Sequence, residues 1–322
     1  MYNKKFLKII ILIVSFILST IIFLSVYFII NKINEIKVKK HIKDSFIGTN
    51  TDKTNYIFDD ELKLFVLKPN TEVTSARKID GQIVYSVKYK SDENSFRYTP
   101  GNKNNNTFIF LGCSFMFGEG INDNETLPYF FSEKVNFNYN VINAGVPGTA
   151  TNTAYIALNS NKFINTVNTK IDYIIYGFFF DHIYRNIVGA HQEGAFKLKN
   201  NKLTVVDNGV SDDVFSNKIL RKYYKNEAIN LTIKLIQEMK ILAEEKYKAQ
   251  FLVFLYDPYE SITMEIKKIL DELGIQNICS TINYSDKPDG YYMIKNECHP
   301  TGNANKENAL TIYNYIFNIK NN

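Results

Sequence analysis

TFIFLGCSFMFGEG, residues 107–120, is the stretch that decides the fold. It begins with a short apolar run, residues 107–111, that is typical of a strand. Gly112 follows, and glycine permits a sharp turn where a side chain would clash. Ser114 then comes at the carboxyl end of the strand, near the N-terminus of a following helix. Backbone N–H groups at such a position can stabilise a developing anion. The stretch indicates either a nucleophilic serine or a glycine-rich turn with an incidental serine.

The same order of strand, loop and helix recurs along the rest of the chain. Further strands are expected at residues 139–143, 173–180 and 251–256, and helices at 125–135, 152–163, 226–249, 261–273 and 303–317. This alternation predicts an α/β fold with a parallel sheet covered on both faces. In such sheets the working residues lie in loops at the carboxyl ends of the strands. Residues 195–206 are expected to form an inserted hairpin that turns at Asn200 and Asn201.

The N-terminal region contains an uncharged apolar run, residues 9–30. Its length, about 22 residues, is enough to span a hydrocarbon core of about 30 Å. No small-residue cleavage site follows it, so an uncleaved anchor is favoured over a signal peptide. Lysines flank the run on both sides, and the positive-inside rule does not choose the orientation. A short tail, residues 1–8, is the usual layout of an anchor whose following domain lies outside the cytoplasm.

Residues 31–106 are predicted to be a stalk and a small β-containing lead-in to the main domain, residues 107–322. The part up to about residue 60 is polar, and strands are expected at residues 62–67 and 82–89. The latter alternates apolar and polar residues, as half-buried strands do.

Composition excludes several classes of function. The net charge of +5 is spread along the chain, whereas nucleic-acid binding would need a clustered basic face. The three cysteines, Cys113, Cys279 and Cys298, cannot form a disulfide framework, although one bridge between the last two is conceivable. No motif implies a metal or an organic cofactor. The oligomeric state is left open.

Four segments, in order, resemble the sequence blocks of the SGNH (GDSL-like) hydrolase superfamily. GCSFMFGEG resembles the first block, with Cys113 where aspartate usually stands, and NAGVPG, residues 143–148, resembles the second. Asp181-His182 occupies the place of the usual Asn-Asp of the third block. Glu297-Cys298-His299-Pro300 resembles the last block. The resemblance implies a three-layer sandwich around a flavodoxin-like parallel sheet, and it covers about residues 107–318.

The resemblance also implies a role for each matching residue. Ser114 would be the nucleophile, and its amide and that of Gly148 would form the oxyanion hole. Ionised Asp181 cannot donate a hydrogen bond, so either His182 replaces the usual Asn as the third donor or the hole has only two donors. An ordinary loop histidine is the alternative for His182. Cys113, Asp181 and Asn143 are expected to border the same pocket.

The last block supplies the expected base and acid. By the resemblance, His299 takes the proton of Ser114 and returns it to the leaving group. Glu297 would orient the imidazole, provided that Cys298 bulges aside, and Asp289 is a fallback acid.

The expected function is acyl transfer through a Ser114 acyl-enzyme. The acyl group is expected to be small, such as acetyl, and water or a sugar hydroxyl to accept it. Residues 90–97, KSDENSFR, look like the lead-in of anchored SGNH proteins linked to surface polysaccharides, with Ser95 where glycine is usual. The expected substrate is therefore an acylated carbohydrate. The alternative is a glycan-binding or scaffold protein with a degraded site.

Overall fold

The computed structural model describes residues 8, 12–27, 45–188, 195–206, 209–284, 288 and 290–317. The chain divides into two compact units. The first comprises Met1–Ser45 and Lys78–Ile83, and the second comprises Phe46–Arg77 and Val84–Asn322. All of the predicted site residues belong to the second unit.

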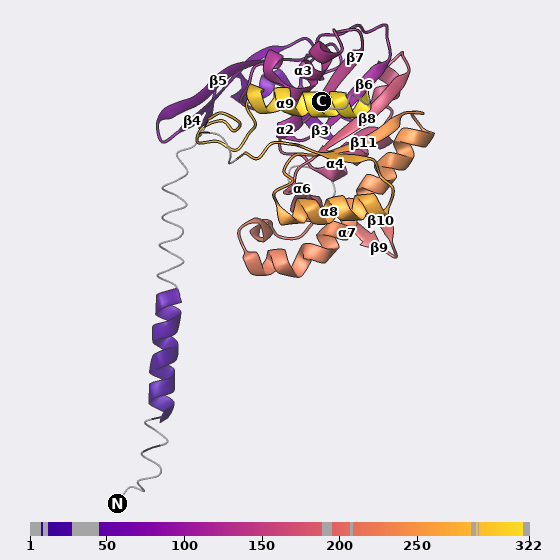
Figure 1. Ribbon diagram of the computed structural model, residues 1–322. Helices are drawn as coiled ribbons and strands as arrows, with labels where there is room; N and C mark the ends of the chain where they lie inside the picture. The colour runs from indigo at the N-terminus through magenta and orange to yellow at the C-terminus, as the bar shows by residue number, and fades with distance from the viewer. Residues whose placement is uncertain are drawn as a thin grey trace, which may run out of the picture. The chain divides into compact units, whose positions relative to one another are not determined.

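The second unit is built on a five-stranded sheet of order β12-β11-β8-β6-β7 (Figure 1). The strands are all parallel, with bounds β6 (Thr107–Gly112), β7 (Asn140–Gly145), β8 (Ile171–Phe178), β11 (Gln250–Leu255) and β12 (Asn277–Cys279). The four predicted strands are thus confirmed, with ends shifted by up to two residues. β12 was not predicted, because its three residues carry no distinguishable apolar pattern.

The order of the strands places a topological switch point at β6. From β6 the chain adds β7 on one side of it and then crosses to β8 on the other. Loops diverge at such a point and leave a crevice at the carboxyl ends of the strands, where ligands bind in open α/β sheets. Ser114 follows β6 and therefore lies at this crevice.

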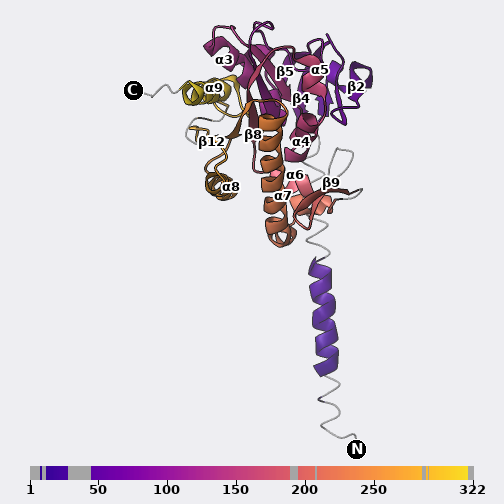
Figure 2. The same ribbon diagram turned by 90° about the vertical axis from the view of Figure 1, so that its right-hand side faces the viewer.

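Side chains of the sheet alternate between two apolar cores. Ile109 and Leu111 of β6 pack with helices on one face, whereas Phe108 and Phe110 pack with helices on the other. The first face is covered by α4 (Thr151–Asn159), α6 (His182–Val188) and α7 (Lys218–Glu245), and the second by α3 (Leu127–Lys134) and α9 (Gly302–Ile316). Figures 1 and 2 show the two sets of helices on opposite sides of the sheet. The predicted three-layer α/β sandwich is confirmed.

The helices follow the sequence expectations with two differences. The helix predicted at 152–163 is two helices, α4 and α5 (Lys162–Thr166), because Ser160 ends the first in an extended conformation. α7 begins eight residues before the predicted start, at Lys218, where the Asn217 side chain caps it by accepting from two backbone amides. α8 (Ser261–Glu272) agrees closely with the predicted bounds.

The predicted hairpin is present as β9 (Ala195–Lys199) and β10 (Lys202–Val206). Asn200 and Asn201 form its turn with φ of 52° and 59°. Asparagine tolerates this left-handed conformation, which two-residue hairpin turns require.

The lead-in is more regular than the sequence indicates. It contains a sheet of order β1-β4-β5, formed by β1 (Ser45–Ile47), β4 (Glu72–Ile79) and β5 (Gln82–Lys90), and a hairpin of β2 (Tyr56–Asp59) and β3 (Leu64–Leu67). Strands therefore begin within the segment that was expected to be a polar stalk. Leu62, Leu64 and Val66 pack into the core beside the first face of the large sheet, so this part of the lead-in belongs to the same compact unit.

Residues 12–27, within the predicted anchor, are helical (Figure 1). The other residues of the 9–30 run lie outside the part of the chain that the structure describes. Among the described residues, no helix is both long and apolar enough to cross a membrane.

Residues 112–117 carry the predicted nucleophile Ser114 and are called the nucleophile turn below. The close packing of Gly145 against this turn yields a prediction about stability. A Cβ at Gly145 would lie 2.3 Å from the backbone nitrogen of Phe117. We expect Gly145→Ala to lower the free energy of unfolding by about 2–3 kcal/mol, as overpacking does. Gly274→Ala is the control, because its Cβ meets nothing within 4 Å and only its φ of +63° is strained; we expect a loss of about 1 kcal/mol. Urea unfolding measures both, and equal losses would contradict the prediction.

Candidate active site

The nucleophile turn is held by close packing of backbone. Ser114 is the first residue of the short helix α2 (Ser114–Phe117) and is only 5% exposed. A Cβ at Gly112 would lie 3.0 Å from Cβ of Met116 and 3.1 Å from the Gly177 carbonyl oxygen, so the turn has room only for glycine. The N–H of Ser114 has no acceptor within its own helix, because it lies in the first turn.

Ser114, His299 and Glu297 form a continuous hydrogen-bonded relay. Oγ of Ser114 lies 2.7 Å from Nε2 of His299. Nδ1 of His299 lies 2.6 Å from Oε2 of Glu297, which also accepts from the His299 backbone N–H at 2.8 Å. The hydrogen bonds that the sequence predicts between these residues are therefore present.

The carboxylate of Glu297 is enclosed and held from its other side by Arg77 of β4. Its side chain is fully buried, and Oε1 accepts from Nη1 of Arg77. Burial works to raise the pKa of Glu297, but the hydrogen bond and charge of His299 and the charge of Arg77 outweigh it and leave the pKa below its ordinary value. Glu297 is thus ionised at neutral pH and suited to stabilise an imidazolium.

The loop before His299 has the shape that this pairing needs. Cys298 is exposed, as predicted, and Asn296 adopts a left-handed φ of 59°. Potential ligand atoms of Glu297, Cys298 and His299 lie within 4.8 Å of one another, a spacing that could hold a metal. Arg77 and Ser114 already engage the Glu297 and His299 atoms, so the arrangement fits a proton relay better. Asp289, the fallback acid, lies outside the described residues.

The predicted second oxyanion donor lies in a loop tied to the nucleophile turn. The Gly112 carbonyl accepts from the Val146 N–H at 2.9 Å and from the Thr149 hydroxyl at 3.4 Å. Gly148, between these residues, is exposed and has a positive φ of 76°. Its backbone can therefore approach a ligand closely.

His182 corrects the expectation for the third donor. Its side chain is wholly buried, and Nδ1 lies 2.7 Å from the hydroxyl of Tyr176 on β8. Nε2 is buried without a hydrogen-bond partner among the described residues. Burial, and then the charge of Arg185, hold the pKa of His182 well below its ordinary value. As the first residue of α6, His182 therefore has its ring buried against Tyr176 rather than exposed in a loop.

The three residues expected to border the pocket have different positions. Asn143 is fully buried in the wall of a cavity that lies beside the nucleophile turn. Its side chain donates to the Phe117 carbonyl and accepts from the Gly145 N–H.

Cys113 and Asp181 lie elsewhere. Cys113 is 1% exposed in the apolar core, and burial raises the pKa of its thiol, which is unsuited to a reactive role. Asp181 faces Arg185 and Arg221 at 3.9 and 3.7 Å. Neither Cys113 nor Asp181 lines that cavity.

The loop after β8, where a third polar donor was expected, brings an aromatic ring against Phe115. Phe179, the first residue after β8, stacks on Phe115 with ring centroids 4.3 Å apart. Phe115 in turn lies 5.5 Å from the ring of His299. The loop after β8 therefore presents an apolar surface to the site. A continuous run of three phenylalanines, residues 178–180, was the sequence signal for this surface.

Sequence reasoning missed Glu119. Its Oε2 lies 3.7 Å from Nε2 of His299, on the side of the imidazole that faces Ser114. Burial raises the pKa of Glu119, and the neighbouring carboxylate of Glu297 raises it further, against the opposing charges of His299 and Arg77. The residue lies within the first sequence block, but its own position carries no signal there.

Arg97, the last residue of the lead-in motif, organises the loop after the nucleophile. It is 2% exposed, and its guanidinium bonds Asp123 at 2.9 Å and the carbonyls of Phe117, Gly118 and Ile121. The guanidinium also lies over the rings of Tyr89 and Phe117, at 4.3 and 4.6 Å. Ser95 adopts φ of 69°, the conformation that explains glycine at this place in the motif.

Cys279 and Cys298 are both free, so the conceivable bridge between them is not formed.

The chain was also compared with known proteins. Neither a family model nor a curated protein matches the sequence. Among solved structures, a member of the lipolytic protein G-D-S-L family from Veillonella parvula is similar over 66% of this chain and 99% of its own, with 13% identity and a TM-score of 0.43. A carbohydrate acetylesterase family member from Sinorhizobium meliloti is similar over 66% and 97%, with 12% identity and a TM-score of 0.39. A carbohydrate esterase is similar over 87% and 98%, with 11% identity and a TM-score of 0.42.

Each of these TM-scores is below 0.5, so the function proposed below rests on the sequence blocks and the site geometry of this chain.

Proposed function

We propose that this chain is an SGNH-type serine acyl-ester hydrolase or O-acyltransferase that works through a Ser114 acyl-enzyme. The relay from Glu297 through His299 to Ser114, with its distances of 2.6 and 2.7 Å, carries the proposal. A nucleophile within hydrogen-bond reach of a base, which a third group orients, is the arrangement that activates a serine. It lies at the carboxyl ends of the strands, at the switch point of the sheet.

The proposed reaction has two halves. Nε2 of His299 takes the proton of Ser114 as Oγ attacks the acyl carbon, and the backbone amides of Ser114 and Gly148 hold the oxyanion. The ester C–O bond then breaks, and His299 returns the proton to the departing alcohol. Water or a second alcohol attacks the acyl-enzyme, with His299 again accepting the proton; the bond between the acyl carbon and Oγ then breaks, and His299 returns the proton to Ser114. Hydrolysis and transfer differ only in this acceptor.

The proposed alcohol component is a carbohydrate at the cell surface. The lead-in segment at residues 90–97 supports this, through its resemblance to anchored SGNH proteins linked to surface polysaccharides. The rival function, a glycan-binding or scaffold protein with a degraded site, is disfavoured by the complete relay. A binding protein would have no need to keep Glu297 buried and ionised between Arg77 and His299.

The nucleophile can be tested with a fluorophosphonate probe. We expect the probe to label the wild-type protein at Ser114, because the relay raises the nucleophilicity of the Oγ atom, and Ser114→Ala to abolish labelling. Ser216→Ala, at an exposed serine, is the matched control and should label normally. Intact-mass analysis gives the readout. An unlabelled wild-type protein that remains folded would favour the binding or scaffold function.

The acid can be tested by an isosteric change. Glu297→Gln should lower kcat on an activated ester by about 10²–10⁴-fold, as acid-to-amide changes do in serine triads. KM should change little, because the imidazolium forms only during reaction. Asp289→Asn is the control and should be close to neutral. If Asp289→Asn is damaging and Glu297→Gln is silent, the acid is misassigned.

We also propose that residues 9–30 anchor the chain in a membrane, with the globular part on the extracytoplasmic side. The uncharged apolar run and the absence of a cleavage site after it support this. We expect the protein to stay with membranes during carbonate extraction and to keep its N-terminal mass. A soluble species that begins near residue 30 would refute the anchor, and cysteine-accessibility labelling reports the side of the domain.

A further inference from the structure

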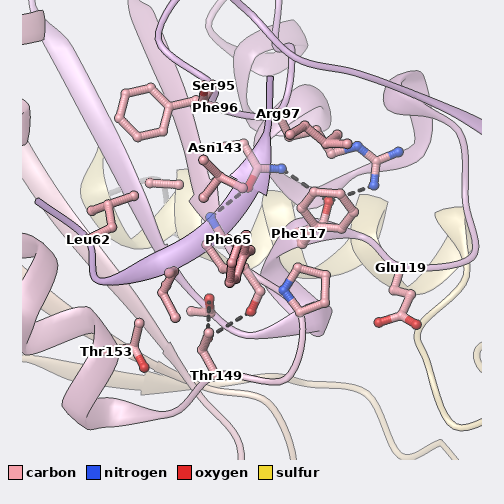
Figure 3. Close-up of a pocket in the computed structure, with 18 of the residues that line it drawn as sticks. Leu62, Phe65, Ser95, Phe96, Arg97, Phe117, Glu119, Asn143, Thr149 and Thr153 are labelled. Carbon is pink, nitrogen blue, oxygen red and sulfur yellow. Dashed lines mark hydrogen bonds between the residues drawn. The ribbon is translucent and has the colours of Figure 1, made fainter. Parts of the chain in front are cut away.

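A cavity of about 350 Å³ lies directly beside the nucleophile turn (Figure 3). Its volume is within the range of small-molecule sites, about 300–1,000 Å³. The mechanism described above makes no use of this space. Its walls come from the lead-in, from the loops after β6 and β7, and from α4 and α5.

The cavity and the catalytic relay share their boundary. Gly112, two residues before Ser114, lines the cavity, and so does Thr149 of the proposed oxyanion loop. Glu119 lines it as well and lies 3.7 Å from Nε2 of His299. In Figure 3, Glu119 lies at the right, whereas Leu62 and Phe96 lie at the left. Ser114 is not itself a lining residue, so a group bound to it would have to enter this space beside Glu119 and Thr149.

The far part of the cavity is aliphatic and aromatic. Leu62 and Leu64 of the lead-in face Ala154 and Ala157 of α4, and all four are buried. Phe163 stacks on Phe96, with ring centroids 5.6 Å apart, and adds to this end. Ala154 and Ala157 are three residues apart and so share one face of α4. Their small side chains leave the volume that larger residues would fill.

Apart from the Glu119 carboxylate, which lies 3.7 Å from Nε2 of His299, polar groups in the wall are largely engaged by the protein itself. The guanidinium of Arg97 bonds Asp123 and three carbonyls. The Asn143 amide and the Thr149 hydroxyl also have backbone partners. A polar ligand such as a sugar would gain little from these occupied groups and would lose its own hydration. An apolar ligand has no hydrogen bonds to water to lose, and burial of its surface contributes favourable binding free energy.

We propose that this cavity binds the acyl chain of the substrate, and that the acyl group is a fatty chain rather than acetyl. If each carbon takes about the volume of a water molecule, about 30 Å³, the space holds on the order of ten carbons. The inference rests on the proposed function and names its acyl substrate. The chemistry is that given above: the acyl carbon exchanges its bond to the alcohol oxygen for one to Oγ of Ser114, and the alcohol leaves with the proton from His299.

Chain-length profiles test the proposal. Each buried methylene contributes about 0.8 kcal/mol, or about fourfold in kcat/KM. Wild-type kcat/KM on nitrophenyl esters should rise from acetate to decanoate. Ala157→Phe should lower the decanoate-to-acetate ratio by at least about tenfold, because it fills the far end. Ile164→Phe, at an exposed position of α5, is the matched control and should leave the ratio unchanged. A wild-type preference for acetate, or equal ratios in Ala157→Phe and the wild type, would overturn the proposal.

Direct binding separates this inference from the proposed function. Calorimetry should show saturable binding of decanoate to Ser114→Ala protein, and weaker binding when Ala154→Phe is added. Absence of saturable binding to the folded Ser114→Ala protein would overturn the acyl-chain site, even if fluorophosphonate labels wild-type Ser114. Conversely, decanoate binding by a protein whose Ser114 resists the probe would support the site and refute the enzyme.

Discussion

The interaction on which the site depends is the buried ion pair between Arg77 and Glu297. It is the first link of a chain of polar contacts that passes through His299 to Ser114. These residues come from a strand of the lead-in, a loop near the C-terminus and the turn after β6. A buried carboxylate without a partner is costly, and removing one partner of such a pair typically costs about 3–5 kcal/mol. The relay therefore requires the lead-in and the sheet domain to be assembled together.

A second buried arginine explains why the lead-in is more than a spacer. Arg97 donates hydrogen bonds to the carbonyls of Phe117, Gly118 and Ile121, and buried carbonyls need such donors. Tyr89 of β5 accepts from the N–H of Gly120 in the same loop, at 2.8 Å. This loop begins three residues after Ser114 and contains Glu119, so the lead-in holds the chain next to the proposed nucleophile. Both contacts tie the segment before residue 107 to the site.

Four strands of the sheet and the three residues of the relay could be predicted from the sequence. Apolar runs identified four strands of the sheet, and resemblance to two sequence blocks predicted the relay of Ser114, His299 and Glu297. Contacts between distant segments could not be predicted. Arg77 is an ordinary residue of an alternating strand, and Glu119 is one of many acidic side chains; only the assembled fold gives them their partners. His182 was expected to be a donor because an ionised Asp181 cannot donate, and its burial against Tyr176 could not be foreseen from the sequence.

The aromatic loop after β8 and the apolar cavity can be understood together. In the proposed mechanism the backbone amides of Ser114 and Gly148 are the oxyanion donors, and loss of a third donor typically costs about 2.7–4 kcal/mol of transition-state stabilisation. Binding energy from a part of the substrate remote from the reaction can be used to offset such a cost. At about 0.8 kcal/mol for each methylene, four or five buried chain carbons supply about that amount. Phe179 and Phe115 extend the apolar surface up to the imidazole of His299. A site of this kind would accelerate reaction of a long acyl ester efficiently and of an acetyl ester poorly, because only the longer chain reaches the walls formed by the lead-in and α4.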